Sequence, residues 1–173
     1  MRQAQVKWFT AVAVGALLGG MPPRLHAQGA ADRVQPRVHF VSANPFTLLA
    51  GWANAEYERR LTPSSTWGLS GSLFSLDTFD YRNATTMVRY YPAGSALTGF
   101  FAGGRAGVFR VTDTFESETL GGAGIELGYT WQLGSAHRLG ISTGGGAVRL
   151  FGGSVMDAPV FIPTVRLNVG ITF

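Results

Sequence analysis

The chain contains no cysteine. This absence excludes disulfide bonds and thiolate metal sites, on which small exported domains often depend for stability. It also excludes a lipoprotein anchor, because a lipoprotein carries its acyl chains on a cysteine at the cleavage site. Other interactions must hold the fold together.

Net charge is small, and the apparent excess of basic residues lies near the N-terminus. The chain carries 14 Lys and Arg against 10 Asp and Glu, a formal charge of +4. Three of the basic residues, Arg2, Lys7 and Arg24, precede the first acidic residue, and the remainder of the chain is close to neutral. Because binding to a phosphate backbone requires a basic patch, we expect no nucleic-acid partner.

No apolar run reaches the roughly 20 residues of a transmembrane helix. The apolar stretch from Trp8 to Leu18 follows a basic start and precedes two helix-breaking prolines, the layout of a secretory signal peptide. We predict Sec-type export, with residues 1–27 removed after Ala27, and Gly29 or Ala30 as alternative ends of the leader. A retained N-terminal anchor is the less favoured interpretation. Residues 28–36 then form a short periplasmic segment.

Beyond the leader no helical periodicity appears, and apolar residues alternate with polar or small ones. In the last segment one face carries Phe161, Pro163, Val165, Leu167, Val169, Ile171 and Phe173, and the other carries Thr164, Arg166, Asn168, Gly170 and Thr172. A period of two predicts β-strands. The second face holds too little apolar volume to fill a dry core, which favours a barrel whose apolar face meets lipid.

Eight such segments follow one another along the chain. They are predicted at Arg37–Thr47, Gly51–Leu61, Thr66–Leu76, Asp80–Tyr91, Gly99–Val111, Thr119–Leu133, His137–Leu150 and Val160–Phe173. One bent strand from Val38 to Leu61 would leave seven, but bacterial single-chain barrels have an even number. We therefore predict an all-β fold over residues 37–173, an antiparallel up-and-down transmembrane β-barrel of eight strands.

Strand parity and connection lengths set the predicted orientation. The turns at 62–65, 92–98 and 134–136 are placed in the periplasm with both termini, and the other connections outside. Five aromatic residues then fall near the periplasmic ends, where amphipathic rings favour the membrane interface: Trp67, Tyr90, Tyr91, Tyr129 and Trp131. The alternative is that aromatic residues are simply enriched in strands.

The chain ends on an aromatic residue, Phe173, preceded at period two by Ile171, Val169 and Leu167. This pattern resembles the C-terminal signal that the barrel-assembly machinery recognises. We therefore expect this machinery and periplasmic chaperones as partners during biogenesis. The assembled protein, which we expect to be a monomer of the cell outer membrane, would then contact outer-membrane lipid and lipopolysaccharide.

Four stretches, in their order and spacing, resemble a known family. They are Asn44-Pro45-Phe46 leading to Tyr57-Glu58-Arg59, then Arg89-Tyr90-Tyr91-Pro92, Glu126-Leu127-Gly128-Tyr129, and the terminal strand from Arg166 to Phe173. Together they are similar to the uncharacterised outer-membrane barrel family filed as domain-of-unknown-function family 3575. The resemblance implies an outer-membrane barrel, and it implies no reaction, ligand or catalytic residue.

Strand phasing places a charged set on the inner face, comprising Glu56, Glu58, Arg60, Arg89, Arg105, Glu126 and Arg166, with Arg105 dependent on the register of its strand. Eight strands enclose a lumen that side chains just fill. Because buried charges must pair, we expect a hydrogen-bonded ion network that plugs the lumen. Two alternatives are a gate in which Arg and Glu exchange partners, and a proton-active carboxylate at Glu126.

No other residue set predicts chemistry. His39 and His137 fall on the periplasmic side, so neither can serve a serine nucleophile at the outer edge of the membrane, as a lipid-modifying enzyme would need. The glycine runs 121–124 and 144–146 do not open a helix, and we expect them at strand bends or where bulky residues cross the lumen. The acidic residues of the outer loops match no calcium loop. We predict no enzymatic activity, no cofactor and no metal.

The function expected from the sequence is a structural or passive role in the outer membrane, with a polar-plugged lumen. A narrow gated pore for small solutes is one alternative. The other is a soluble lipocalin-like periplasmic ligand-binding barrel, which predicts an apolar cavity and solubility without detergent.

Overall fold

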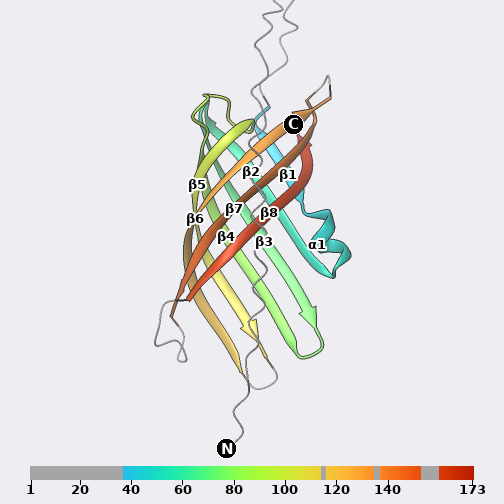
Figure 1. Ribbon diagram of the computed structural model, residues 1–173, viewed down its shortest axis with the longest axis vertical. Coiled ribbons are helices and arrows are strands. Elements are labelled where there is room, and N and C mark those ends of the chain that lie inside the picture. Colours follow the sequence, from blue (N-terminus) through green and yellow to red (C-terminus); the bar gives the residue numbers. More distant parts are fainter. Residues whose placement is uncertain (1–36, 114–115, 135–136, 153–159) are drawn as a thin grey trace, which may run out of the picture. The chain divides into compact units, whose positions relative to one another are not determined.

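Eight strands close into one antiparallel barrel in sequence order (Figure 1). The structure is a computed structural model that describes residues 37–113, 116–134, 137–152 and 160–173. The strands are β1 His39–Ala43, β2 Trp52–Thr62, β3 Ser65–Leu76, β4 Phe79–Tyr90, β5 Gly99–Thr112, β6 Ser117–Leu133, β7 Leu139–Phe151 and β8 Val160–Thr172. The predicted eight-stranded up-and-down barrel is confirmed, and the seven-strand alternative is wrong. The predicted signal peptide and residues 28–36 lie outside the described residues.

The predicted first strand, Arg37–Thr47, is only partly correct. β1 ends at Ala43, and a short helix, α1 (Pro45–Leu49), follows it. The Asn44 side chain accepts hydrogen bonds from the backbone N–H groups of Phe46 and Thr47, and proline occupies the first turn. After α1 the chain turns at Gly51, whose φ of +78° favours glycine. No helix among the described residues is long and apolar enough to span a membrane.

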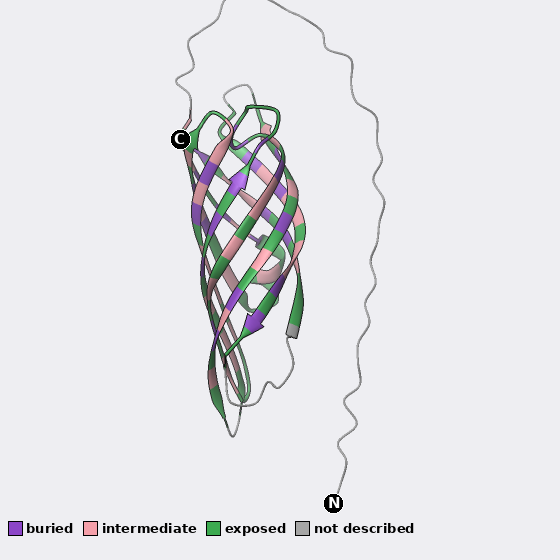
Figure 2. Cartoon of the chain, turned by 90° about the vertical axis from the view of Figure 1, so that its left-hand side faces the viewer, coloured by how far each residue is buried: buried purple, intermediate pink, exposed green. Residues whose placement is uncertain are grey.

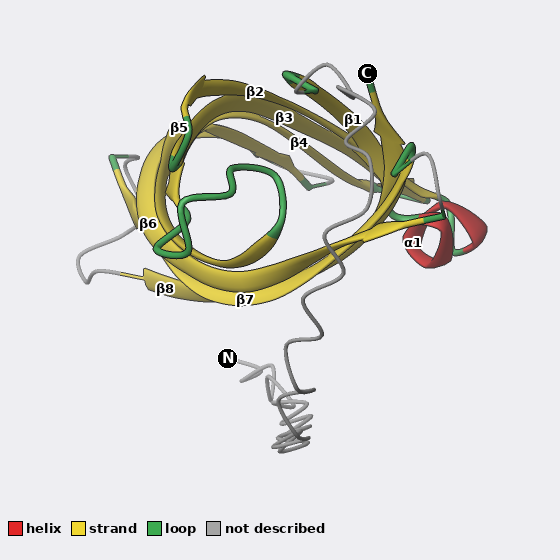
Figure 3. Ribbon diagram, turned by 90° about the horizontal axis from the view of Figure 1, so that it is seen from above, coloured by secondary structure: helices red, strands yellow, loops and turns green. Residues whose placement is uncertain are grey.

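The two ends of the barrel differ in their connections. One end, here called the terminal end, carries Phe173 and the connections β2–β3, β4–β5 and β6–β7, and it is uppermost in Figure 1. The opposite end, the loop end, carries the connections β3–β4, β5–β6 and β7–β8. The loop between β4 and β5 folds across the terminal mouth of the barrel (Figure 3), where Ala96 and Leu97 are each only 3% exposed.

Burial alternates along the strands, as the period-two pattern predicts (Figure 2). On β6, Ile125 and Leu127 are exposed and point outward, whereas the intervening Glu126 is buried and points inward. β8 repeats this arrangement with exposed Val165 and buried Arg166. The outer surface of these strands is therefore largely apolar, and Glu126 and Arg166 lie inside, whereas Arg82 and Arg149 on other strands are exposed.

The interior is layered rather than uniformly polar, which corrects the expectation of an inner face made of small, polar and charged residues. An apolar cluster of Phe109, Leu120, Val148 and Leu150 lies on the β5–β7 side. A second cluster, Tyr91, Ala96 and Phe101, lies beside the β4–β5 loop. The charged residues occupy the level between these clusters.

Inward-facing glycines allow neighbouring strands and bulky rings to approach closely. A Cβ atom at Gly170 would lie 2.0 Å from the carbonyl oxygen of Val41, and one at Gly128 would lie 2.4 Å from the Phe101 ring. The two glycine runs belong to β6 and β7, and neither opens a helix. Within the run 121–124, a Cβ atom at Gly122 would lie 2.5 Å from the Phe109 ring, in agreement with the prediction that bulky side chains cross the lumen at these glycines.

Candidate functional site

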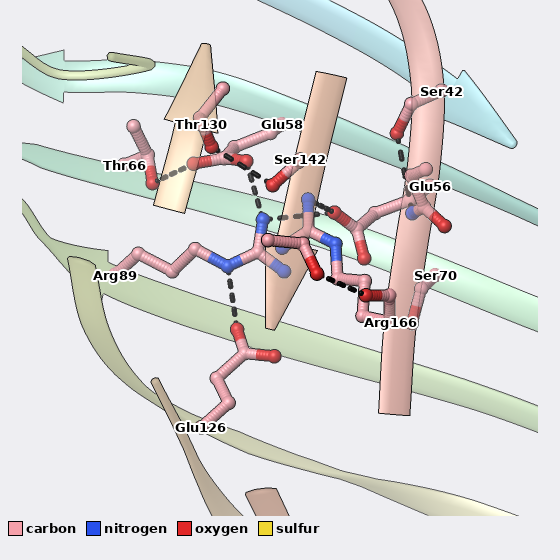
Figure 4. A network of polar contacts seen from close by, with 12 residues as sticks. Ser42, Glu56, Glu58, Thr66, Ser70, Arg89, Glu126, Thr130, Ser142 and Arg166 are labelled. Atoms are coloured by element: carbon pink, nitrogen blue, oxygen red, sulfur yellow. Dashed lines mark hydrogen bonds and ion pairs between the residues drawn. The ribbon is translucent and has the colours of Figure 1, made fainter. Parts of the chain in front are cut away.

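Arg89 lies at the centre of the lumen and joins three carboxylates from two sides of the barrel (Figure 4). Its Nη1 donates to Glu56 Oε1 at 2.8 Å and to Glu58 Oε2, both on β2. Its Nε donates to Glu126 Oε1 on β6 at 2.5 Å. The Arg89 side chain is fully buried, so these acids provide the charge compensation that water would otherwise supply.

Two further arginines extend the network toward the loop end. Arg105 Nη2 on β5 lies 2.5 Å from Glu126 Oε2, so both oxygens of that carboxylate are engaged. Arg166 Nη2 on β8 lies 2.6 Å from Glu56 Oε1, the oxygen that also accepts from Arg89. The resulting ion network contains three arginines and three glutamates and connects strands on opposite sides of the lumen.

Glu58 is the most buried of the acids and receives two additional hydrogen bonds. Thr66 Oγ1 on β3 donates to its Oε1 at 2.5 Å, and the Tyr91 hydroxyl donates to the same oxygen at 2.8 Å. Together with Arg89 on Oε2, these donors engage both oxygens of the carboxylate. Glu58 is therefore held as a hydrogen-bonded carboxylate at the centre of the lumen.

Phe101 forms an apolar layer on the terminal-end side of the arginines. Its ring centroid is 4.8 Å from Arg89 Cζ and 5.4 Å from Arg166 Cζ, within the range of cation–π attraction. The same ring packs against Tyr91 at a centroid distance of 5.6 Å. Ions and water moving along the barrel axis would therefore have to pass both the ion network and this aromatic layer.

Six of the seven predicted inner charges meet in this network, including Arg105, whose prediction depended on strand register. Arg60 is the exception, because it forms no ion pair within the described part of the chain. The sequence interpretation missed the contributions of Thr66, Tyr91 and Phe101. Counting back from Arg105 in two steps of two residues would have placed Phe101 on the inner face.

Tyr91 also corrects the predicted aromatic girdle. Tyr90, Tyr129 and Trp131 are exposed on the outer surface, but Tyr91 is fully buried and faces the lumen. The reason is the alternation itself, since two consecutive strand residues point to opposite faces. The outer aromatic set near the terminal end is therefore one residue smaller than predicted.

A cavity of about 430 Å³ adjoins the ion network toward the loop end. Arg105, Glu126 and Arg166 line it together with polar residues of β2, β3 and β8. Trp52, Tyr81 and Ile162 provide apolar lining. The lumen is thus not completely filled by side chains, in contrast to the sequence-based expectation.

Several guanidinium donors of the network have no hydrogen-bond acceptor among the described residues. They include Nε and Nη1 of Arg166 and Nε of Arg105. Buried polar groups in native proteins are nearly always satisfied, so each such donor requires an explanation. Arg166 and Arg105 are also the two arginines that line the cavity.

Outside the ion network, His39 was considered from the sequence as a possible catalytic base. His39 Nδ1 lies 2.8 Å from the Tyr57 hydroxyl, and its ring stacks on Phe173 at the terminal end. Within the described residues, no three His, Cys, Asp or Glu side chains gather as metal ligands. Comparisons of the chain with protein-family models, with curated proteins and with solved structures find no match.

Proposed function

We propose that the chain is a small integral outer-membrane β-barrel whose lumen is closed by the ion network, with a structural, non-conducting role in that membrane. The single observation that carries the proposal is the inverted polarity of the barrel. Val165 is 89% exposed and Ile125 is 71% exposed, while Arg89 is fully buried. A water-soluble barrel has the opposite arrangement, with an apolar interior and a polar surface.

The outward apolar residues occur on every long strand. They include Leu61, Leu69, Leu73, Val88, Phe100, Val108, Ile125, Leu127, Leu139, Phe161, Val165 and Ile171, each exposed. A soluble monomer rarely exposes a contiguous apolar surface of this extent. Lipid is the solvent in which such a surface is stable, and barrel closure satisfies the backbone hydrogen bonds that lipid cannot. This distribution favours the membrane over the soluble lipocalin-like alternative.

The remaining parts of the proposal follow from this placement. An even strand number supports a terminal end that faces the periplasm, with Tyr90, Tyr129 and Trp131 at the membrane interface. The C-terminal residues Phe173, Ile171 and Leu167 are exposed on the outer surface, where the barrel-assembly machinery could contact them. Lipid and lipopolysaccharide are the partners that the apolar surface fits.

A narrow gated pore is the second candidate, and the cavity next to the ion network favours it. Because the cavity already provides space on one side of the network, an exchange of partners between Arg89 and its glutamates could open a path. The two candidates differ in the conductance that they predict.

The test combines extraction and electrical recording. Membranes of expressing cells are fractionated, and the extracted protein is run on a detergent gel with and without boiling. A folded membrane barrel resists the detergent until heated and shifts in mobility. The same protein is then inserted into planar bilayers. Membrane fractionation, a heat-dependent shift and the absence of channel steps are the expected results.

Charge-reversal variants at Arg89 and at Glu126 accompany the wild-type recording. Discrete channel steps in wild-type protein, altered by either substitution, would refute the non-conducting role and establish the pore. A protein that stays in the soluble fraction, with no heat-dependent shift, would refute the membrane placement itself.

A further inference from the structure

The barrel wall is incompletely paired where β1 is short. β1 pairs with residues 56–59 of β2 and with residues 169–172 of β8. The segments Trp52–Ala55 of β2 and 160–168 of β8 pair only with β3 and β7, respectively. On the side where β1 would continue, neither segment has a strand partner within the described residues. The wall therefore has a lateral break between β2 and β8 in the half nearer the loop end.

Pro163 marks the same break. It lies opposite Ala147 of β7 and has no strand neighbour on its other side among the described residues. Proline cannot donate a ladder hydrogen bond, so within sheets it is confined to edge strands or bulges. A proline in this position is compatible with an edge that stays open.

The helix α1 lies outside the barrel ring beside this break (Figure 3). Asn54 of β2 holds it in place: its Oδ1 accepts from the backbone N–H of Asn44, and its Nδ2 donates to Thr47 Oγ1, both at 2.8 Å. The apolar residues of α1 remain exposed, with Leu49 at 88%. The break thus has a polar inner edge and an apolar outer rim.

The cavity meets the break from inside. Its lining includes Trp52 and Asn54 from the unpaired edge of β2, and Ile162 and Thr164 from the unpaired edge of β8. At its base are Arg105 and Arg166, whose Nε atoms have no acceptor among the described residues. Both oxygens of Glu126, by contrast, are already paired. What the base lacks is a hydrogen-bond acceptor, and a charged acceptor forms the strongest bonds with guanidinium donors.

We propose that this cavity binds a single-chain amphiphile with an anionic head, and that the chain of the amphiphile leaves through the break between β2 and β8. The head accepts hydrogen bonds from Arg166 and Arg105, and the chain lies along Trp52 and Ile162 toward the apolar rim at α1. A volume of about 430 Å³ is within the roughly 300–1,000 Å³ of small-molecule sites. This inference rests on the proposed membrane placement, because lipid receives the protruding chain.

Quenching of Trp52 fluorescence tests the proposal. The outward Trp67 and Trp131 are replaced by Phe, which leaves Trp52 as the reporter in the processed chain. The protein is folded into zwitterionic lipid vesicles and titrated with dodecanoic acid that carries bromine on its chain. Brominated dodecyl phosphate and brominated dodecanol are titrated in parallel. We expect saturable quenching by at least one of the two anions, with the alcohol about tenfold weaker or worse, the effect of losing a charge-assisted hydrogen bond.

Matched variants locate the site. In the same background, Thr164→Phe fills the cavity, and Leu167→Phe, at an outward position of the same strand that does not line the cavity, leaves it open. Arg166→Gln removes the charge at the base. Saturable quenching should be lost in Thr164→Phe, weakened about tenfold in Arg166→Gln, and retained in Leu167→Phe. The heat-dependent gel shift of each variant shows whether it has folded.

The outcomes distinguish the two possible head groups of the ligand from the absence of a specific site. Binding of the carboxylate alone identifies a fatty acid, and binding of the phosphate alone identifies a phosphorylated lipid chain. Quenching that rises without saturation, or that is equal for acid and alcohol and unchanged by Thr164→Phe, reflects partition into the bilayer and overturns the proposal. Failure of the protein to enter vesicles would instead refute the proposed membrane placement, and the gel shift detects that failure separately.

Discussion

Replacing Arg89 with methionine should strongly destabilise the barrel. Methionine keeps most of the length of the side chain and removes the charge. The substitution deprives Glu56, Glu58 and Glu126 of a shared partner. Removing one member of a buried ion pair costs about 3–5 kcal/mol, because the remaining charge is left uncompensated.

The ion pairs and hydrogen bonds that remain in Arg89→Met determine where the loss of stability falls within this range. Arg166 still faces Glu56, and Arg105 still faces Glu126. Glu58 keeps only the hydrogen bonds from Thr66 and Tyr91, so it carries most of the penalty. We therefore expect a loss of about 3 kcal/mol in the free energy of unfolding, the lower end of that range.

The assay is equilibrium unfolding by urea in lipid vesicles, followed by tryptophan fluorescence and by the gel shift. Arg82→Met is the control, because Arg82 is exposed on the same strand and belongs to no ion pair of the network. It should change stability by about 0.5 kcal/mol or less. In the double variant Arg89→Met/Glu58→Gln the two effects should be non-additive by about 0.5–3 kcal/mol in the stabilising direction. Equal stability of Arg89→Met and Arg82→Met would refute the reasoning that the network holds the barrel together.

Two further predictions concern the pairing of β1 with β8, which closes the barrel, and the C-terminal residue of the chain. Gly170→Ala should destabilise the barrel by about 1–3 kcal/mol in the same urea assay, because the new Cβ would lie 2.0 Å from the carbonyl oxygen of Val41. Gly71→Ala, whose Cβ would lie 3.5 Å from the carbonyl oxygen of Asn83, should be near neutral. Equal effects of the two substitutions would contradict the close approach of β1 and β8. Phe173→Ser should lower the fraction of newly made protein that acquires the heat-dependent shift in cells. Phe161→Ser, at an exposed residue of β8, the strand that Phe173 follows, should not lower it. Matching losses would rule out a specific role of the C-terminus in assembly.

The barrel and the ion network could be predicted from the sequence because both depend on local alternation. Once Leu127 is assigned to the outer face, Glu126 must point inward, and the same holds for Val165 and Arg166. Buried charges of both signs must then pair. This reasoning needs only the phase of each strand, which the apolar residues supply.

Helix α1 was not predicted, although the sequence contains signals for it. Asn44 is a favourable N-cap, Pro45 suits the first helical turn, and Gly51 suits the turn after the helix. The helix spans only residues 45–49, too short a segment for a helical period to appear. The cavity was missed for a different reason: it depends on which inner side chains face each other across the lumen, which strand phase alone does not define.

The early end of β1 at Ala43 is encoded by specific residues in the sequence. Extending β1 beyond Ala43 would give the open edges of β2 and β8 a partner, and in lipid each unsatisfied backbone group costs several kcal/mol. Instead, Asn44 and Pro45 start helix α1 at that point, and the side chain of Asn54 holds the helix by hydrogen bonds. On the other side of the break, β8 carries Pro163, which has no N–H group to leave unsatisfied. In the proposed membrane placement, the ion network at Arg89 would block passage along the barrel axis, and the break between β2 and β8 would leave the adjoining cavity accessible from the side.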